Sequence, residues 1–79
     1  MQPKDIENAI KQHIKDADII VYDIKKTGDH FIINVKSNKF KSITLIEQHK
    51  MVMKSLHKYI NGKNAQIHAV DIKTSIKSN

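Results

Sequence analysis

The sequence predicts a small α+β domain in which the elements follow in the order helix, strand, strand, helix, strand. Two stretches carry apolar residues at spacings of three and four, which is typical of helices with one buried face. Three runs are rich in β-branched and aromatic residues, which is typical of strands. The 79 residues are enough for one domain, spanning 1–79, and leave no room for a second. We therefore expect a three-stranded sheet with both helices packed on one face.

The first helix is predicted to run from Pro3 to about Asp16. Proline in the first turn and an acid at Asp5 suit the start of a helix, where the helix dipole favours negative charge. One face of this helix is apolar and consists of Ile6, Ala9, Ile10, His13, Ile14 and Ala17. Since His13 lies on this face, we expect it to be packed and hydrogen-bonded rather than to bind a ligand.

Two strands joined by a turn are predicted next. Residues 19–24 are β-branched or aromatic, and Phe31, Ile33 and Val35 alternate with more polar positions, as in a strand with one buried face. The segment 25–29 between them contains Gly28, which supplies a backbone angle that other residues avoid. The two strands should therefore pair as a hairpin.

A second helix is predicted to begin at Ser42 or Thr44, either of which could cap it, and to end at residues 61–62, Asn-Gly. Its apolar seam consists of Leu45, His49, Val52, Leu56, Tyr59 and Ile60, flanked by Ile46 and Met53. His49 lies on this seam, so we expect it to be packed as well.

The third strand is predicted over residues 66–72, and the polar segment 74–79 is expected to fray. The predicted strand and helix faces should then meet in one core, with His49 packed against it. Its expected members are Ile10, Ile14, Ile33, Val52, Leu56 and Val70.

Charge is distributed unevenly along the chain. Residues 1–24 carry three Lys and five acids, whereas residues 25–79 carry eleven Lys and three acids. All the basic residues are Lys, which binds phosphate as a point charge and cannot read guanine edges as Arg does. The basic part is either a solvated surface or a binding surface for an acidic protein or, without sequence preference, DNA. Its candidate residues are Lys36, Lys39, Lys41, Lys50, Lys54 and Lys58.

Several classes of function are disfavoured. There is no Cys, no Gly-rich phosphate loop, no H-E-x-x-H spacing and no marked nucleophile–base pair, so we expect neither an enzyme nor a small-molecule substrate. No apolar run approaches the roughly 18 residues of a membrane span, and the first residues lack the features of a secretion signal. We therefore expect a cytoplasmic protein that does not bind membranes.

Histidines are the residues best suited to hold a metal. His30 opens the second predicted strand and His68 lies in the third, while His57 is expected to be solvated. Two imidazoles brought together could supply half of a four-coordinate iron or zinc site. Whether His30 and His68 meet depends on the order of the strands, which spacing does not give.

Several segments, in order, resemble the BolA family. The compact turn at residues 27–30 looks more like the family's short-loop IbaG-type branch than its founding long-loop branch. Residues 67–74, IHAVDIKT, are similar to the family's I-H-A-[LV]-x-[IL]-K-[TA] signature, and residues 29–35, DHFIINV, to its S-H-F-x-V-x-V strand. Phe40 with Ser42, followed by residues 48–52, resembles the stretch F-x-G-x-S…R-H-R-[ML]-V. The resemblance covers about residues 5–75.

This resemblance implies a class II KH-like α-β-β-α-β fold with a mixed sheet. It also implies partnership with a monothiol glutaredoxin and a shared [2Fe–2S] cluster, in iron–sulfur trafficking and iron regulation. His68 matches the family's C-terminal cluster ligand. The second ligand lies in the first loop, where His30 is the candidate and Thr27 stands at the position used by several members. Alone, the chain is expected to hold no cluster.

The family implies one alternative, a DNA-binding transcriptional regulator of morphology and stress genes. A third hypothesis is a plain interaction module without metal. The chain departs from the motifs at Lys41, which replaces a Gly, and at Gln48 and Lys50, which replace two Arg. The tail also lacks the usual T-P-x-E-W. The loss of both Arg weakens the DNA alternative more than the cluster.

Overall fold

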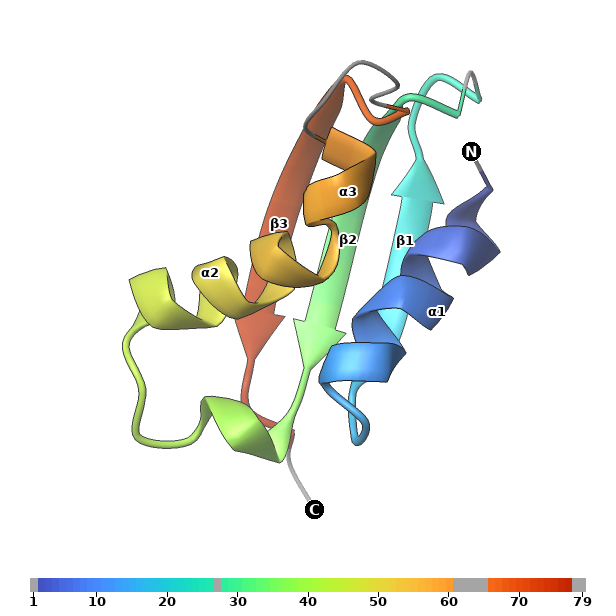
Figure 1. Cartoon of the computed structure of the whole chain (residues 1–79). Helices are drawn as coiled ribbons and strands as arrows, with labels where there is room; N and C mark the ends of the chain where they lie inside the picture. The colour runs from blue at the N-terminus through green and yellow to red at the C-terminus, as the bar shows by residue number, and fades with distance from the viewer. Residues whose placement is uncertain (1, 27, 61–65, 78–79) are drawn as a thin grey trace.

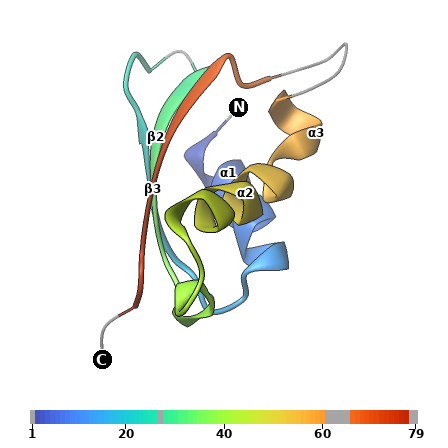
Figure 2. The same cartoon turned by 90° about the vertical axis from the view of Figure 1, so that its left-hand side faces the viewer.

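The computed structural model describes residues 2–26, 28–60 and 66–77 (Figure 1). The predicted order of elements is confirmed, with one added 3-10 turn and a divided second helix. The elements are α1 (Pro3–His13), β1 (Asp18–Asp23), β2 (His30–Lys36), η1 (Asn38–Phe40), α2 (Leu45–Ser55), α3 (His57–Ile60) and β3 (Ala69–Ser75). Figure 2 shows that the helices cover one face of the sheet and leave the other face open.

The three strands form a mixed sheet in the order β1-β2-β3. β1 pairs with β2 antiparallel, from Asp18 opposite Lys36 to Asp23 opposite Phe31, which confirms the predicted hairpin. β2 pairs with β3 in parallel, from His30 beside Ala69 to Lys36 beside Ser75. A parallel pair needs a long crossover connection, and η1, α2 and α3 provide it on the helical face.

The core lies between the sheet and the helices. Alternate residues of β2 are fully buried, so the central strand directs its apolar side chains towards α1 and α2. Of the predicted core residues, five are buried together and Val70 packs against them half-buried. The buried apolar side chains are Ile6, Ala9, Ile10, Ile14, Ala17, Phe31, Ile33, Val35, Phe40, Val52, Leu56, Ile67 and Ile72.

α1 ends at His13, about three residues before the predicted boundary. Ile14 leaves the helical conformation, with φ −125° and ψ 86°, so it reaches the core from the connection to β1. The expected packing of His13 is wrong, because this side chain is exposed, although its Nδ1 lies 3.3 Å from the carbonyl oxygen of Ala9. At the other end, the Asp5 carboxylate accepts the backbone N–H of Gln2 at 3.0 Å.

The second predicted helix is divided in two at Leu56, where the chain turns into α3. Of the two candidate caps, Thr44 is the one used, since its Oγ1 accepts the Glu47 N–H at 3.2 Å. Leu45 is 60% exposed, because the first turn of α2 extends beyond β3, the edge strand (Figure 1). The prediction that Leu45 belongs to the buried seam of this helix is therefore wrong. The predicted stop at residues 61–62 lies outside the described residues.

β3 begins at Ala69 and extends to Ser75, three residues later than predicted at each end. Residues 74–77 do not fray as expected, because Thr74 and Lys77 both make long-range contacts; residues 78–79 lie outside the described part of the chain. Among the described helices, none is long and apolar enough to cross a membrane.

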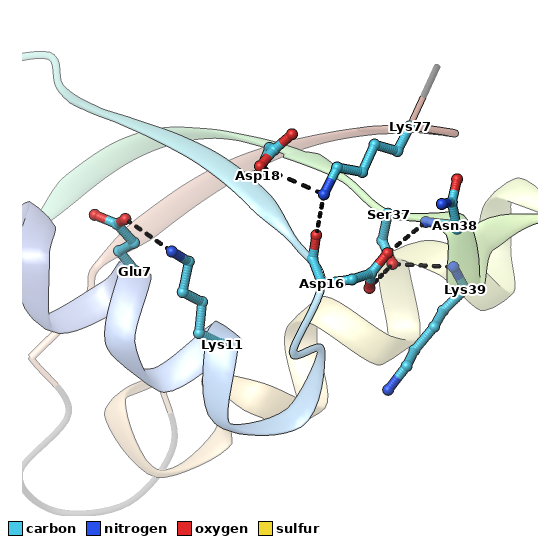
Figure 3. A network of polar contacts seen from close by, with 8 residues as sticks. All are labelled: Glu7, Lys11, Asp16, Asp18, Ser37, Asn38, Lys39 and Lys77. Carbon is cyan, nitrogen blue, oxygen red and sulfur yellow. Dashed lines mark hydrogen bonds and ion pairs between the residues drawn. The ribbon is translucent and has the colours of Figure 1, made fainter. Parts of the chain in front are cut away.

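A polar network holds the segment after α1, the end of β2 and the C-terminal segment together (Figure 3). The Asp16 carboxylate accepts the Ser37 hydroxyl at 2.6 Å and the Asn38 N–H at 2.8 Å. Lys77 Nζ donates to the carbonyl oxygen of Asp16 at 2.9 Å and lies 3.7 Å from the Asp18 carboxylate. The hydrogen bond from Ser37, then that from Asn38, lowers the pKa of Asp16.

Candidate functional site at the histidine end of the sheet

The sheet topology brings His30 and His68 to the same end of the molecule. His30 begins β2, and β3 begins beside it with Ala69, so His68 immediately precedes the parallel strand. The carbonyl oxygen of Asp29 accepts two backbone N–H groups, from His68 at 2.7 Å and from Ala69 at 3.1 Å. These two hydrogen bonds fasten the segment that carries His68 to the residue that precedes His30. The strand order, which the sequence left open, therefore places the backbones of the two histidines at the same end of the sheet.

The two side chains are available to a second molecule to different degrees. His68 is exposed, and His30 is half-buried. Because His30 alternates with the buried Phe31, it lies on the open face of the sheet. An uncharged imidazole offers one ring-nitrogen lone pair to a metal. Within the described residues, no three His, Asp or Glu side chains are grouped as a metal site would need.

The turn before His30 is held by Asp23. Its Oδ2 accepts the Gly28 N–H at 3.0 Å, and its carbonyl oxygen accepts the Lys26 N–H at 3.2 Å. Gly28 has φ 77°, which confirms its predicted role, and Lys26 has φ 55°. Thr27, the alternative ligand position, lies outside the described residues. Since this turn fixes where β2 begins, Asp23 helps to position His30.

The other oxygen of Asp23 makes this turn unusual. Among the residues that the structure describes, Asp23 Oδ1 is buried and has no hydrogen-bond partner. Sequence reasoning missed this residue, although an Asp at the start of a Gly-containing turn is a recognisable signal.

The six predicted binding lysines are all exposed, but the fold distributes them over different surfaces. Lys36 lies on the open face of the sheet, whereas Lys50 and Lys54 lie on α2, on the other side. Lys39 and Lys41 belong to η1 and the residue after it. The structure therefore does not bring all six together.

Lys50, Lys54 and Lys58 recur every four residues in the sequence, but the break at Leu56 interrupts this row, and α3 turns away from the axis of α2 (Figure 1). Lys58 Nζ lies 5.1 Å from the centre of the Tyr59 ring and lines a shallow pocket of about 270 Å³ beside α1. Lys50 lies 3.8 Å from the Glu47 carboxylate. Only Lys50 and Lys54 remain on one continuous helix.

Gln48, which stands where the family motif has an Arg, is buried against β3. Its Nε2 donates to the carbonyl oxygens of Ile43, at 3.1 Å, and Phe40, at 3.4 Å. Its Oε1 accepts the Thr74 hydroxyl at 2.6 Å. Gln48 therefore joins the loop before α2 to the sheet, and it contributes no surface group that could contact a nucleic acid.

Comparison with known proteins identifies the family. A family model described as BolA-like protein matches residues 2–79. The chain belongs to the BolA family. An uncharacterised protein of Rickettsia prowazekii is 28% identical over 71 residues, which are 90% of this chain and 88% of that protein. The resemblance over residues 5–75 is thereby confirmed.

Solved structures show the same BolA fold. The NMR structure of the Rickettsia prowazekii protein, described as BolA-like, has a TM-score of 0.73 and 26% identity, covering 99% of this chain and 97% of that one. The crystal structure of a Bol-like protein from Babesia bovis has a TM-score of 0.80 at 17% identity, covering 96% and 85%. At that identity the second likeness concerns the fold alone.

Proposed function

We propose that this BolA-family chain is a non-enzymatic accessory protein that partners a monothiol glutaredoxin and shares a [2Fe–2S] cluster with it, in iron–sulfur trafficking and iron regulation. The observation that carries the proposal is the pair of backbone hydrogen bonds that the Asp29 carbonyl oxygen accepts, which keeps His68 beside the start of β2. His68, exposed at this end, is the first ligand, and His30 is the second.

The available donor atoms support a shared cluster. A [2Fe–2S] cluster takes four ligands from its surroundings, commonly thiolates, and imidazoles can replace two of them. This chain has no Cys, so it can offer imidazoles only. The glutaredoxin and its glutathione would supply the two thiolates. When bound, the cluster is the redox-active and transferable group, and the chain's own part is to hold two nitrogen ligands at the end of a rigid sheet.

The test is the visible spectrum of a cluster-loaded glutaredoxin homodimer as this chain is added. Replacing two thiolates with imidazoles should change the spectrum and raise the reduction potential. The chain alone should be colourless. His68→Ala should abolish the spectral change, and His30→Ala should weaken it. His57→Ala is the matched control, because His57 is exposed on α3 and should leave the conversion intact.

A second measurement separates association of the two proteins from coordination of the cluster. Titration calorimetry of the two apo-proteins should detect binding with both wild type and His68→Ala, since a surface contact needs no metal. An unchanged spectrum with the wild type, or full conversion with His68→Ala, would defeat the ligand assignment. Binding without any spectral change would leave only an interaction module.

A further inference from the structure

The open face of the sheet carries exposed apolar side chains. Ile20 and Tyr22 on β1 are 54% and 51% exposed, and Ile32 lies half-buried beside Tyr22 on β2. The helices all lie on the opposite face (Figure 2), so no described element covers these side chains. A shallow groove of about 310 Å³ on this face is lined in part by Ile20, Asn34 and Lys73. Contiguous apolar surface of this kind is typical of an interaction site.

The charges on this face nearly cancel, whereas the whole chain carries +6. Alternation along the strands places four charged side chains here, namely Asp18, Lys36, Asp71 and Lys73. Lys77 adds one positive charge at the edge, where it pairs with Asp18. Two copies of this basic protein would therefore repel each other only weakly if they met through this face.

The strand register makes the face complementary to itself. Ile20, Asn34 and Lys73 form one row across the three strands, and Tyr22, Ile32 and Asp71 form the next. A two-fold axis that crosses the strands between these rows would place each row opposite the other row of the second copy. Ile20 would then face Tyr22 of the second copy, and Lys73 would face Asp71 of the second copy, each contact occurring twice as in an isologous dimer.

We propose that the open face of the sheet is a homodimer interface, in which Tyr22 of each copy covers the groove beside Ile20 of the other. The inference does not rest on the proposed glutaredoxin partnership, although His30 lies on the same face. The expected strength of the dimer follows from the size of the interface. Three strands about 4.8 Å apart and six or seven residues long, at about 3.3 Å per residue, give a face of roughly 300 Å² in projection. That is well below a standard interface, so the dimer should be weak, with a Kd on the order of 100 μM.

The test is sedimentation equilibrium of the full chain at concentrations up to about 1 mM. Salt of about 0.15 M limits the repulsion between copies to about 8 Å. The wild type should dimerise within this range. Lys73→Asp and Asp71→Lys should each weaken self-association about tenfold or more, because each places like charges opposite one another. An equimolar mixture of the two variants should dimerise again, since the introduced carboxylate of one faces the introduced ammonium of the other.

The controls change charge by the same amount away from this face. Lys54→Asp and Glu47→Lys alter exposed residues of α2 and should leave the dimer unchanged. Circular dichroism checks that each variant is folded. In the wild type, backbone amide chemical shifts of Ile20, Tyr22 and Ile32 should depend on concentration. A wild type that stays monomeric to about 1 mM, or a mixture that fails to restore association, would overturn the proposal and assign the face to a different partner.

Discussion

Replacing Gln48 with methionine tests how α2 is fastened to the sheet. Methionine keeps nearly the same length and shape but cannot form the hydrogen bonds to Ile43, Phe40 and Thr74. The bonds to Ile43 and Thr74 are well formed, at 3.1 and 2.6 Å, and the third, at 3.4 Å, is weak. At about 1 kcal/mol for each good hydrogen bond, with a further penalty for the partners left buried, the free energy of unfolding should fall by about 2–3 kcal/mol.

Urea denaturation followed by far-UV circular dichroism measures this loss, and an unchanged m-value would show that the compactness of the two states is preserved. Thr74→Val removes the other partner of the 2.6 Å bond. In a double-mutant cycle, the Gln48→Met and Thr74→Val changes should be coupled by about 1 kcal/mol, because they share that bond. If Gln48→Met lowers the free energy of unfolding by less than about 0.5 kcal/mol, or if the two changes are additive in the cycle, the hydrogen bonds of Gln48 do not fasten α2 to the sheet.

Three further predictions follow from the core, the polar network and the surface charge. Leu56→Ala removes a fully buried side chain at the break between α2 and α3 and should cost about 2–5 kcal/mol in urea denaturation, whereas Leu45→Ala, at an exposed position of α2, should cost less than 1 kcal/mol. Asp16→Asn should destabilise the protein at neutral pH. Since the pKa of Asp16 is lowered in the folded state, chiefly by the Ser37 hydrogen bond, its contribution is present above the ordinary carboxyl pKa and is lost as pH falls through the lowered value. The difference in melting temperature between wild type and variant should therefore shrink as pH falls below about 4, and a difference that does not shrink with falling pH would contradict this reasoning. DNA binding should be weak, without sequence preference, and should fall steeply between low and physiological salt, because lysine contacts act through counterion release. Fluorescence anisotropy with two unrelated duplexes checks this, and tight sequence-selective binding at physiological salt would instead favour the transcriptional regulator.

Local patterns were sufficient to predict most of the architecture. The alternation of Phe31, Ile33 and Val35 identifies the central strand, and it is the same alternation that buries these residues against the helices. Gly28 identifies the turn, because glycine has no Cβ and adopts a positive φ at no steric cost. The core residues of α1 follow from helical periodicity. These features depend on neighbours within a few positions, which a single sequence contains.

Features that depend on distant segments could not be predicted in this way. Gln48 looks like an ordinary polar helix residue until β3 places Thr74 against it. Thr74 likewise looks like part of a polar tail, which is why the strand was predicted to end too early. The site has the same character: His68 and His30 are 38 positions apart, and only the parallel pairing of β2 with β3 brings them to one end.

The parallel pairing of β2 with β3 also determines the order in which the sheet can be completed. Every residue of β2 pairs with one that lies 39 positions later, as His30 does with Ala69. About half of the chain therefore separates the two paired strands in the sequence. Closing so long a loop is entropically costly, and contacts of this range slow folding relative to helical proteins of the same size. Until Ala69 and the residues after it have been synthesised, one edge of the most buried strand stays unpaired and available to other chains. A chain truncated before Ala69 should therefore aggregate rather than form a smaller version of this domain.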